Sequence, residues 1–175
     1  MAGHIDSILS IWLHAVMSER THSPEGAAVT ALFLEIFRLN GALLAQGDRL
    51  VGDLGLTSAR WQVMGAVAMS PAPLPVAGVA RNMGLTRQAV QRIADDLAQA
   101  GFVRFADNPH HRRAKLVVLT AAGVAAYRAA MARQVPWANR LTAGLDPRRL
   151  GAARAVLHML AQRLEGREKP KEQLT

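Results

Sequence analysis

Residues 84–120 read GLTRQAVQRIADDLAQAGFVRFADNPHHRRAKLVVLT, and the hydrophobic period changes in the middle of this stretch. Up to Ala100 the apolar residues recur every three or four positions, which is typical of one face of a helix. Thr86 is suited to cap that helix and Gly101 to end it. After Gly101, FVRFAD and AKLVVLT are short β-prone runs, and NPHHRR between them has turn-forming composition. We therefore predict a helix followed by a basic β-hairpin.

The predicted helix over 86–100 has an apolar face and a polar face. The apolar stripe consists of Ala89, Val90, Ile93, Leu97 and Ala100. The polar side chains point outward near the N-terminal half: Thr86, Arg87, Gln88, Gln91 and Arg92. In the DNA major groove, arginine pairs with guanine, glutamine pairs with adenine, and threonine contacts phosphate or the thymine methyl group. The ordinary alternative is a solvated helix face, so the helix alone leaves both interpretations open.

A shorter helix is predicted just before this one, over about 76–83, with a turn at residues 84–85. Its apolar residues have helical spacing: Val76, Val79, Ala80 and Met83. A short helix, a tight turn, a second helix and a basic hairpin form the order of a winged helix-turn-helix. Arg112 and Arg113 lie at the predicted hairpin tip. There, a long cationic side chain reaches phosphates or the minor groove.

Long helices are predicted on both sides of this module. Residues 24–46 form a helix that is apolar nearly all round, with Ser23 as its cap. A second subunit is the expected cover for such a helix in a chain of this size. Two more helices are predicted after the hairpin, over about 121–142 and 147–164, capped by Thr120 and Asp146.

Between the first long helix and the module, a helix capped by Thr57 is predicted, with Trp61, Met64 and Ala68 turned inward. At the start of the chain, residues 5–18 carry an apolar stripe at helical spacing: Ile5, Ile8, Leu9, Trp12 and Val16. The first twenty residues lack a basic leader and do not resemble a signal peptide. The chain is therefore expected in the cytoplasm, without a membrane partner.

The charge of the chain is unevenly distributed. The net charge of the 175 residues is +8. Residues 1–80 carry four basic and six acidic groups, residues 81–115 carry seven and three, and residues 116–175 carry ten and four. The positive excess begins at the predicted helix-turn-helix, which suits a polyanionic partner such as DNA. The alternative explanation is that a biased genomic base composition favours arginine codons.

Composition also argues against other classes of protein. The chain has no cysteine, so a disulfide framework and a thiolate zinc site are excluded. The six histidines are scattered or, at His110 and His111, adjacent, so they lack the spacing of a metal site. Since no phosphate loop, catalytic triad or carboxylate pair is found either, we predict no metal, no cofactor and no enzymatic activity.

At residues 85–120 the sequence resembles the MarR family of bacterial transcription regulators. The matching features are LT at the start of the second helix, a wing similar to D-P-x-D-R-R, and a return strand similar to K-x-V-x-LT. The order of long helices agrees over about 25–165. The resemblance implies a homodimer with interlocked N- and C-terminal helices, two winged lobes on a pseudo-palindromic DNA site, and ligands that weaken DNA binding.

The chain departs from the family pattern in two places. His111 stands where an acidic residue is common before the arginine pair, which makes the wing more positive at acid pH. The helix over 5–18 is additional, and it resembles an extension found in members that respond to aromatic or urate-like ligands. An extra helix that only packs on the dimer interface is the alternative.

The resemblance also suggests effector contacts, because Asn40, Trp61 and Met64 lie on helices that flank a cleft in this family. Trp12 and His14 of the extra helix are candidates to close that cleft. The alternative is structural, since a Trp–Met stripe at helical spacing ordinarily belongs to a core.

We therefore predict a mainly α fold with a small β-hairpin wing, a winged helix-turn-helix that dimerises through its N- and C-terminal helices. The expected segments are an extra helix (1–22), a dimerisation helix (23–52), the DNA-binding lobe (53–120), C-terminal dimerisation helices (121–165) and a polar tail (166–175). The expected function is a transcription regulator, as a repressor released by a small ligand such as an aromatic compound. The alternative is a winged protein-interaction module that no longer binds DNA.

Overall fold

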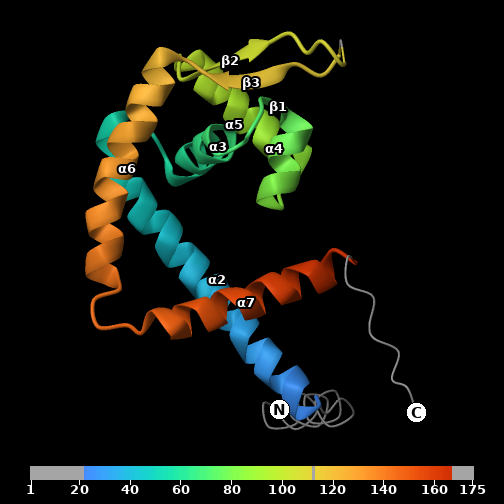
Figure 1. The fold of residues 1–175 in the computed structure, drawn as a ribbon, viewed down its shortest axis with the longest axis vertical. Helices are drawn as coiled ribbons and strands as arrows, with labels where there is room; N and C mark the ends of the chain where they lie inside the picture. Colours follow the sequence, from blue (N-terminus) through green and yellow to red (C-terminus); the bar gives the residue numbers. More distant parts are fainter. Residues whose placement is uncertain (1–21, 112, 167–175) are drawn as a thin grey trace, which may run out of the picture. The chain divides into compact units, whose positions relative to one another are not determined.

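A computed structural model describes residues 22–111 and 113–166 of the chain (Figure 1). The predicted extra helix with Trp12 and His14, Arg112 of the wing, and the tail from residue 167 lie outside these described residues. The chain divides into two compact units, Met1–Tyr127 and Arg128–Thr175, and the boundary falls inside one long helix.

The described elements follow the predicted order. The helices are α2 (Pro24–Val51), the short 3-10 turn η1 (Gly52–Leu54), α3 (Ser58–Ala68), α4 (Val76–Met83), α5 (Arg87–Gln99), α6 (Ala121–Leu141) and α7 (Pro147–Leu164). The strands are β1 (Leu74–Pro75), β2 (Val103–Ala106) and β3 (Leu116–Leu119). The mainly helical fold with a small antiparallel sheet confirms the predicted mainly α fold with a β-hairpin wing.

Helix α2 begins as predicted and ends later. The hydroxyl of Ser23 accepts a hydrogen bond from Gly26 N at 3.1 Å, and Pro24 follows in the first turn. A hydrogen bond from the Glu25 backbone holds the pKa of the Glu25 carboxyl below its usual value. A hydrogen bond with the Ser23 side chain makes a smaller contribution in the same direction. The helix runs on to Val51, beyond the predicted end near residue 46, because its last turn packs on α3.

Most of α2 is exposed in the single chain although it is strongly apolar. Only Gly47 and Val51 are buried, whereas large apolar side chains stand free in the described structure: Leu34, Phe37, Leu39, Leu43 and Leu44. By length and composition alone, Pro24–Leu54 is also apolar enough to cross a membrane. A helix that is covered by another protein surface has the same composition.

The core of the first unit lies between α3, α4 and α5. Its fully buried side chains include Val63 and Met64 of α3, Val79 of α4, and Val90 and Leu97 of α5. Each such side chain contributes about 1.5–3 kcal/mol relative to an exposed position. The three helices therefore form a packed core beneath the outer face of α5.

Two predicted core positions were wrong. Ala68 and Ala100 are exposed, whereas Ala94, which was not predicted, is completely buried. Ala94 lies between Val90 and Leu97 on the face that meets α3 and α4, so the buried stripe is Val90–Ala94–Leu97. Ala68 and Ala100 stand at the C-terminal ends of their helices, beyond the last packed turn.

A three-stranded antiparallel sheet follows the helices, in the order β1-β3-β2. The hairpin pairs Val103 with Leu119 and Ala106 with Leu116, as the two β-prone runs predict. Strand β1 was not predicted, because its two residues lie in the PAPLP segment and pair with residues 116–117 far along the chain. Pro75 is tolerated there because β1 is an edge strand.

Two glycines permit close backbone contacts within the first unit. A Cβ on Gly47 of α2 would lie 2.5 Å from the Ser58 hydroxyl of α3. A Cβ on Gly123, in the first turn of α6, would collide with the backbone carbonyl of Phe102. Thr120 completes this second joint, because its hydroxyl donates to Gly101 O at 2.6 Å and accepts from Gly123 N at 3.0 Å. The start of α6 is therefore held against the start of the hairpin.

The second unit contains the rest of α6 and all of α7. The predicted cap of α7 is confirmed, since Asp146 Oδ1 accepts from Arg148 N at 2.9 Å. Among described residues 128–166, Ala130 is the one buried hydrophobic residue, and the large apolar side chains of α7 are exposed: Leu150, Val156, Leu157 and Leu164. Like α2, this unit presents an apolar surface.

Candidate nucleic-acid interface

The turn between α4 and α5 holds the two helices in a fixed relation. Gly84 has a left-handed backbone with φ of 64°, a conformation that favours glycine. Leu85 N donates to Ala80 O at 3.0 Å, and Gly84 N donates to Arg81 O, so the end of α4 is closed by backbone bonds. The Thr86 hydroxyl then accepts from Ala89 N at 3.2 Å and caps α5. These are the two helices of a helix-turn-helix.

The outer face of α5 is polar and open. The structure places Thr86, Arg87, Gln88 and Arg92 at exposed positions and Gln91 at a half-buried one. The Thr86 hydroxyl can still donate its own hydrogen while it caps the helix. The amide of Gln91 is engaged, because its Nε2 donates to Asp95 Oδ1 at 2.9 Å. Four of the five predicted side chains are therefore open to solvent, and the fifth, Gln91, is half-buried and bonds within its own helix.

The tip of the wing is organised by one residue that the sequence interpretation missed. Asn108 Nδ2 donates to Ala114 O at 3.0 Å, and its Oδ1 accepts from His110 N at 3.0 Å. Its backbone carbonyl accepts from His111 N at 3.2 Å. The Asn-Pro pair is a known turn signal, since asparagine closes its own backbone turn. This turn presents Arg113 to solvent, while Arg112 lies outside the described residues.

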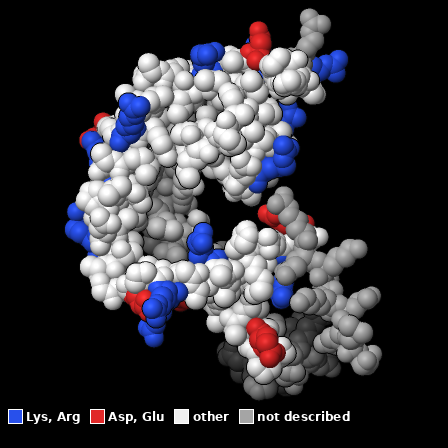
Figure 2. Space-filling view, in the orientation of Figure 1, with Lys and Arg blue, Asp and Glu red and all other residues white. Residues whose placement is uncertain are grey.

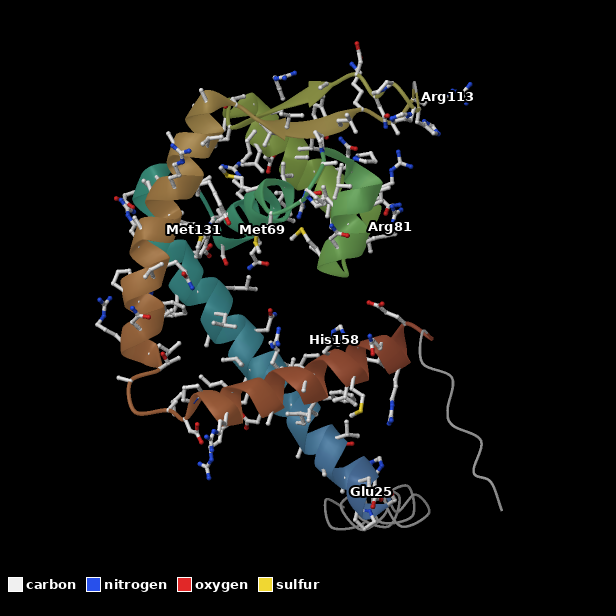
Figure 3. The ribbon with its side chains drawn as sticks, in the orientation of Figure 1. Glu25, Met69, Arg81, Arg113, Met131 and His158 are labelled. Atoms are coloured by element: carbon white, nitrogen blue, oxygen red, sulfur yellow. The ribbon has the colours of Figure 1, made fainter. Side chains whose placement is uncertain are left out.

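Other exposed cations lie near the polar face of α5 and the tip of the wing. Arg81 of α4, Arg104 of β2 and Lys115 of the wing are exposed. Figure 3 shows Arg81 and Arg113 projecting toward the same side of the first unit. In Figure 2, Lys and Arg side chains recur along that side, from the hairpin tip toward α4. The sequence already showed that residues 81–115 carry a positive excess. Only the structure shows that these cations are exposed.

The two carboxylates of α5 have partners within the protein, and one of these contacts is an ion pair. Asp96 lies 3.6 Å from the Arg60 guanidinium, and this ion pair joins α5 to α3. Asp95 accepts the hydrogen bond from Gln91. Both acidic residues of the helix therefore have partners, and the positive side chains determine the sign of the surface.

The predicted effector residues lie in different environments. Asn40 is exposed on α2, and Trp61 is half-buried on α3. Met64 is 0 % exposed and belongs to the core between the three helices. This placement fits the core alternative for Met64, and a ligand would have to displace packed side chains to reach it.

Taken together, α3, α4, α5 and the three-stranded sheet define a winged helix-turn-helix protein. Residues 54–114 match the model of the MarR family. An uncharacterised protein of Mycobacterium tuberculosis is 37% identical over 142 residues, which cover 81% of this chain and 97% of the relative.

Solved structures share this fold. AbsC, a MarR family transcriptional regulator from Streptomyces coelicolor, superimposes with a TM-score of 0.70 at 21% identity, covering 84% of this chain and 99% of AbsC. CouR from Rhodococcus jostii RHA1, bound to p-coumaroyl-CoA, gives a TM-score of 0.67 at 24% identity, covering 74% of this chain and 91% of CouR. The chain belongs to the MarR family, whose members are transcription regulators and not enzymes.

Proposed function

We propose that this regulator binds duplex DNA as a homodimer and represses transcription from a pseudo-palindromic operator. In this proposal α5 enters the major groove and the wing contacts the flanking backbone. The observation that carries it is the outer face of α5, where Thr86, Arg87, Gln88, Gln91 and Arg92 project from a helix locked by its core.

The charge of the same surface supports a DNA partner. The exposed cations of the helix-turn-helix and the wing are Arg81, Arg87, Arg92, Arg104, Arg113 and Lys115. Each phosphate that such a cation neutralises releases counterions. The logarithm of the affinity therefore falls by about 0.9 per contact for each tenfold rise in salt concentration. Arg112 is the remaining proposed contact, next to Arg113 in the sequence.

The exposed apolar helices support the proposed dimer. Leu34, Phe37 and Leu43 of α2 are uncovered in the single chain, as are Leu157 and Leu164 of α7. A second copy would remove this surface from water and bring two α5 helices about one DNA turn apart, roughly 34 Å. The proposed dimerisation segments are therefore residues 23–52 and 121–165.

A small ligand is the proposed signal for release from DNA. CouR, which shares the fold, binds p-coumaroyl-CoA, an aromatic acyl thioester. The proposed contacts in this chain are Asn40 and Trp61, with Trp12, His14 and Met64 as further candidates. A thermal-shift screen of small aromatic acids and their thioesters tests this part of the proposal.

A gel-shift experiment with the DNA upstream of the protein's own reading frame tests DNA binding. We expect a salt-sensitive complex in which Arg87→Ala relaxes base preference and Arg112→Ala weakens binding to all sequences. Arg167→Ala, which removes an arginine of the polar tail outside the proposed DNA-binding and dimerisation segments, is the matched control. If both variants bind like the wild type, the interface is wrong. If no duplex binds, the protein-interaction module becomes the better interpretation.

A further inference from the structure

We propose that Asp95 is a positioning residue that fixes the side-chain amide of Gln91 so that Gln91 reads adenine. This inference rests on the proposed function, because it takes the outer face of α5 to contact DNA bases. Asp95 places a negative charge on the DNA-facing helix, which is unfavourable beside phosphates. The inference gives this carboxylate a role in base recognition.

The geometry begins with one hydrogen bond. Gln91 and Asp95 are one helical turn apart on α5, and Gln91 Nε2 lies 2.9 Å from Asp95 Oδ1. An ionised carboxylate only accepts hydrogen bonds, so the NH2 end of the amide must face Asp95. The carbonyl oxygen Oε1 of Gln91 is then directed away from Asp95. A free glutamine lacks this constraint, because rotation about its last torsion exchanges the two ends.

The constrained amide matches one base better than the others. Adenine offers an N6–H donor and an N7 acceptor in the major groove, and a glutamine pairs with both through Oε1 and one N–H. In the proposal, Asp95 takes the Nε2 hydrogen that points away from Oε1. The second hydrogen and Oε1 remain side by side for adenine. Guanine presents two acceptors, O6 and N7, so it would place an acceptor against Gln91 Oε1.

The neighbouring Asp96 provides an internal comparison. It carries the same charge, but it faces α3 and pairs with the Arg60 guanidinium at 3.6 Å. Asp95 and Asp96 therefore have the same chemistry and different partners. A substitution of either one removes one negative charge from α5, whereas only a substitution at Asp95 releases the Gln91 amide.

The test selects binding sites for full-length protein from a random duplex pool and then measures affinities for duplexes with each base at the selected positions. The variants are Asp95→Asn, the matched control Asp96→Asn, Gln91→Ala, and Gln91→Ala combined with Asp95→Asn. Asparagine at 95 can donate as well as accept, so it no longer dictates which end of the Gln91 amide faces it.

We expect wild-type protein to prefer adenine over guanine at one position in each half-site, by about 5- to 100-fold for a bidentate pair. Asp95→Asn should lower this preference at least about fivefold, while Asp96→Asn retains it. In the Gln91→Ala background, Asp95→Asn should have no further effect on base preference. The midpoint of thermal unfolding and the salt dependence of DNA affinity should be close to the same values in Asp95→Asn and Asp96→Asn. If Asp95 had only a structural role, Asp95→Asn would change the thermal midpoint and not the base preference.

The two proposals fail in different ways. If the wild type selects no sequence and binds no duplex, the proposed function fails, and the inference fails with it. If the wild type selects a site and Asp95→Asn keeps the same adenine preference as Asp96→Asn, only the inference is overturned. The Gln91–Asp95 bond would then be a surface contact of neighbouring turns, which is worth little for either stability or recognition.

Discussion

Gly123→Ala should damage the joint between the wing and α6. The new methyl group would overlap the Phe102 carbonyl oxygen, which is backbone and cannot rotate away. That carbonyl also accepts from Thr120 N at 3.0 Å and from the Thr120 hydroxyl at 3.3 Å. Overpacking typically costs about 1–3 kcal/mol, and a weakened hydrogen bond adds about 1 kcal/mol. The helix propensity of alanine returns up to about 1 kcal/mol.

The expected net loss in the free energy of unfolding is therefore about 1–3 kcal/mol, which lowers the midpoint of thermal unfolding by about 2–4 °C for each kcal/mol. Thermal unfolding followed by circular dichroism measures it. Gly151→Ala in α7 is the control, because a Cβ there meets no atom within 4 Å and should leave stability unchanged or slightly higher. A Gly123→Ala protein as stable as the wild type would refute the close approach of α6 and the hairpin.

Three further predictions concern the cap of α5, the apolar surface of α2 and a cation of α4. Thr86→Ala removes the α5 cap and should cost about 1 kcal/mol by urea unfolding, whereas Thr86→Ser should retain most of it; equal stabilities would contradict the capping role. Phe37→Asp places a charge on the α2 surface, where Phe37 is 71% exposed. It should weaken the proposed dimer on the order of 100-fold or more in sedimentation, since two phenylalanines worth about 1.5–3 kcal/mol each leave the interface. Arg81→Ala should reduce the salt slope of DNA binding by about 1 and lower affinity for all sequences alike, unlike Arg167→Ala; an unchanged slope would remove Arg81 from the interface.

The beginnings of the helices were predictable because their signals are local. Thr57, Thr86, Thr120 and Asp146 were expected as caps, and each accepts a hydrogen bond from a backbone N–H two or three residues ahead. A cap and its partner are neighbours in the chain, so residue type and spacing contain the whole interaction. The hairpin was predictable for the same reason, since a turn-rich segment separates two β-prone runs.

Contacts between distant segments were not predictable in this way. Strand β1 exists because Leu74 and Pro75 pair with residues more than forty positions later, and no local signal marks them. The burial of Ala94 instead of Ala100 depends on where α3 and α4 cross α5. The Gln91–Asp95 bond was within reach of the sequence, because four-residue spacing places the two side chains on adjoining turns.

From the sequence alone came the order of the helices and the wing, the family, and the polar residues on one face of α5. Periodicity, caps and turn residues act within a few positions of the chain, which is why they can be read without coordinates. The tertiary structure decided which of those residues are free. It committed Met64 to the core and Asp96 to Arg60. These assignments depend on packing between segments far apart in sequence, and burial and hydrogen-bond partners are settled only when those segments meet.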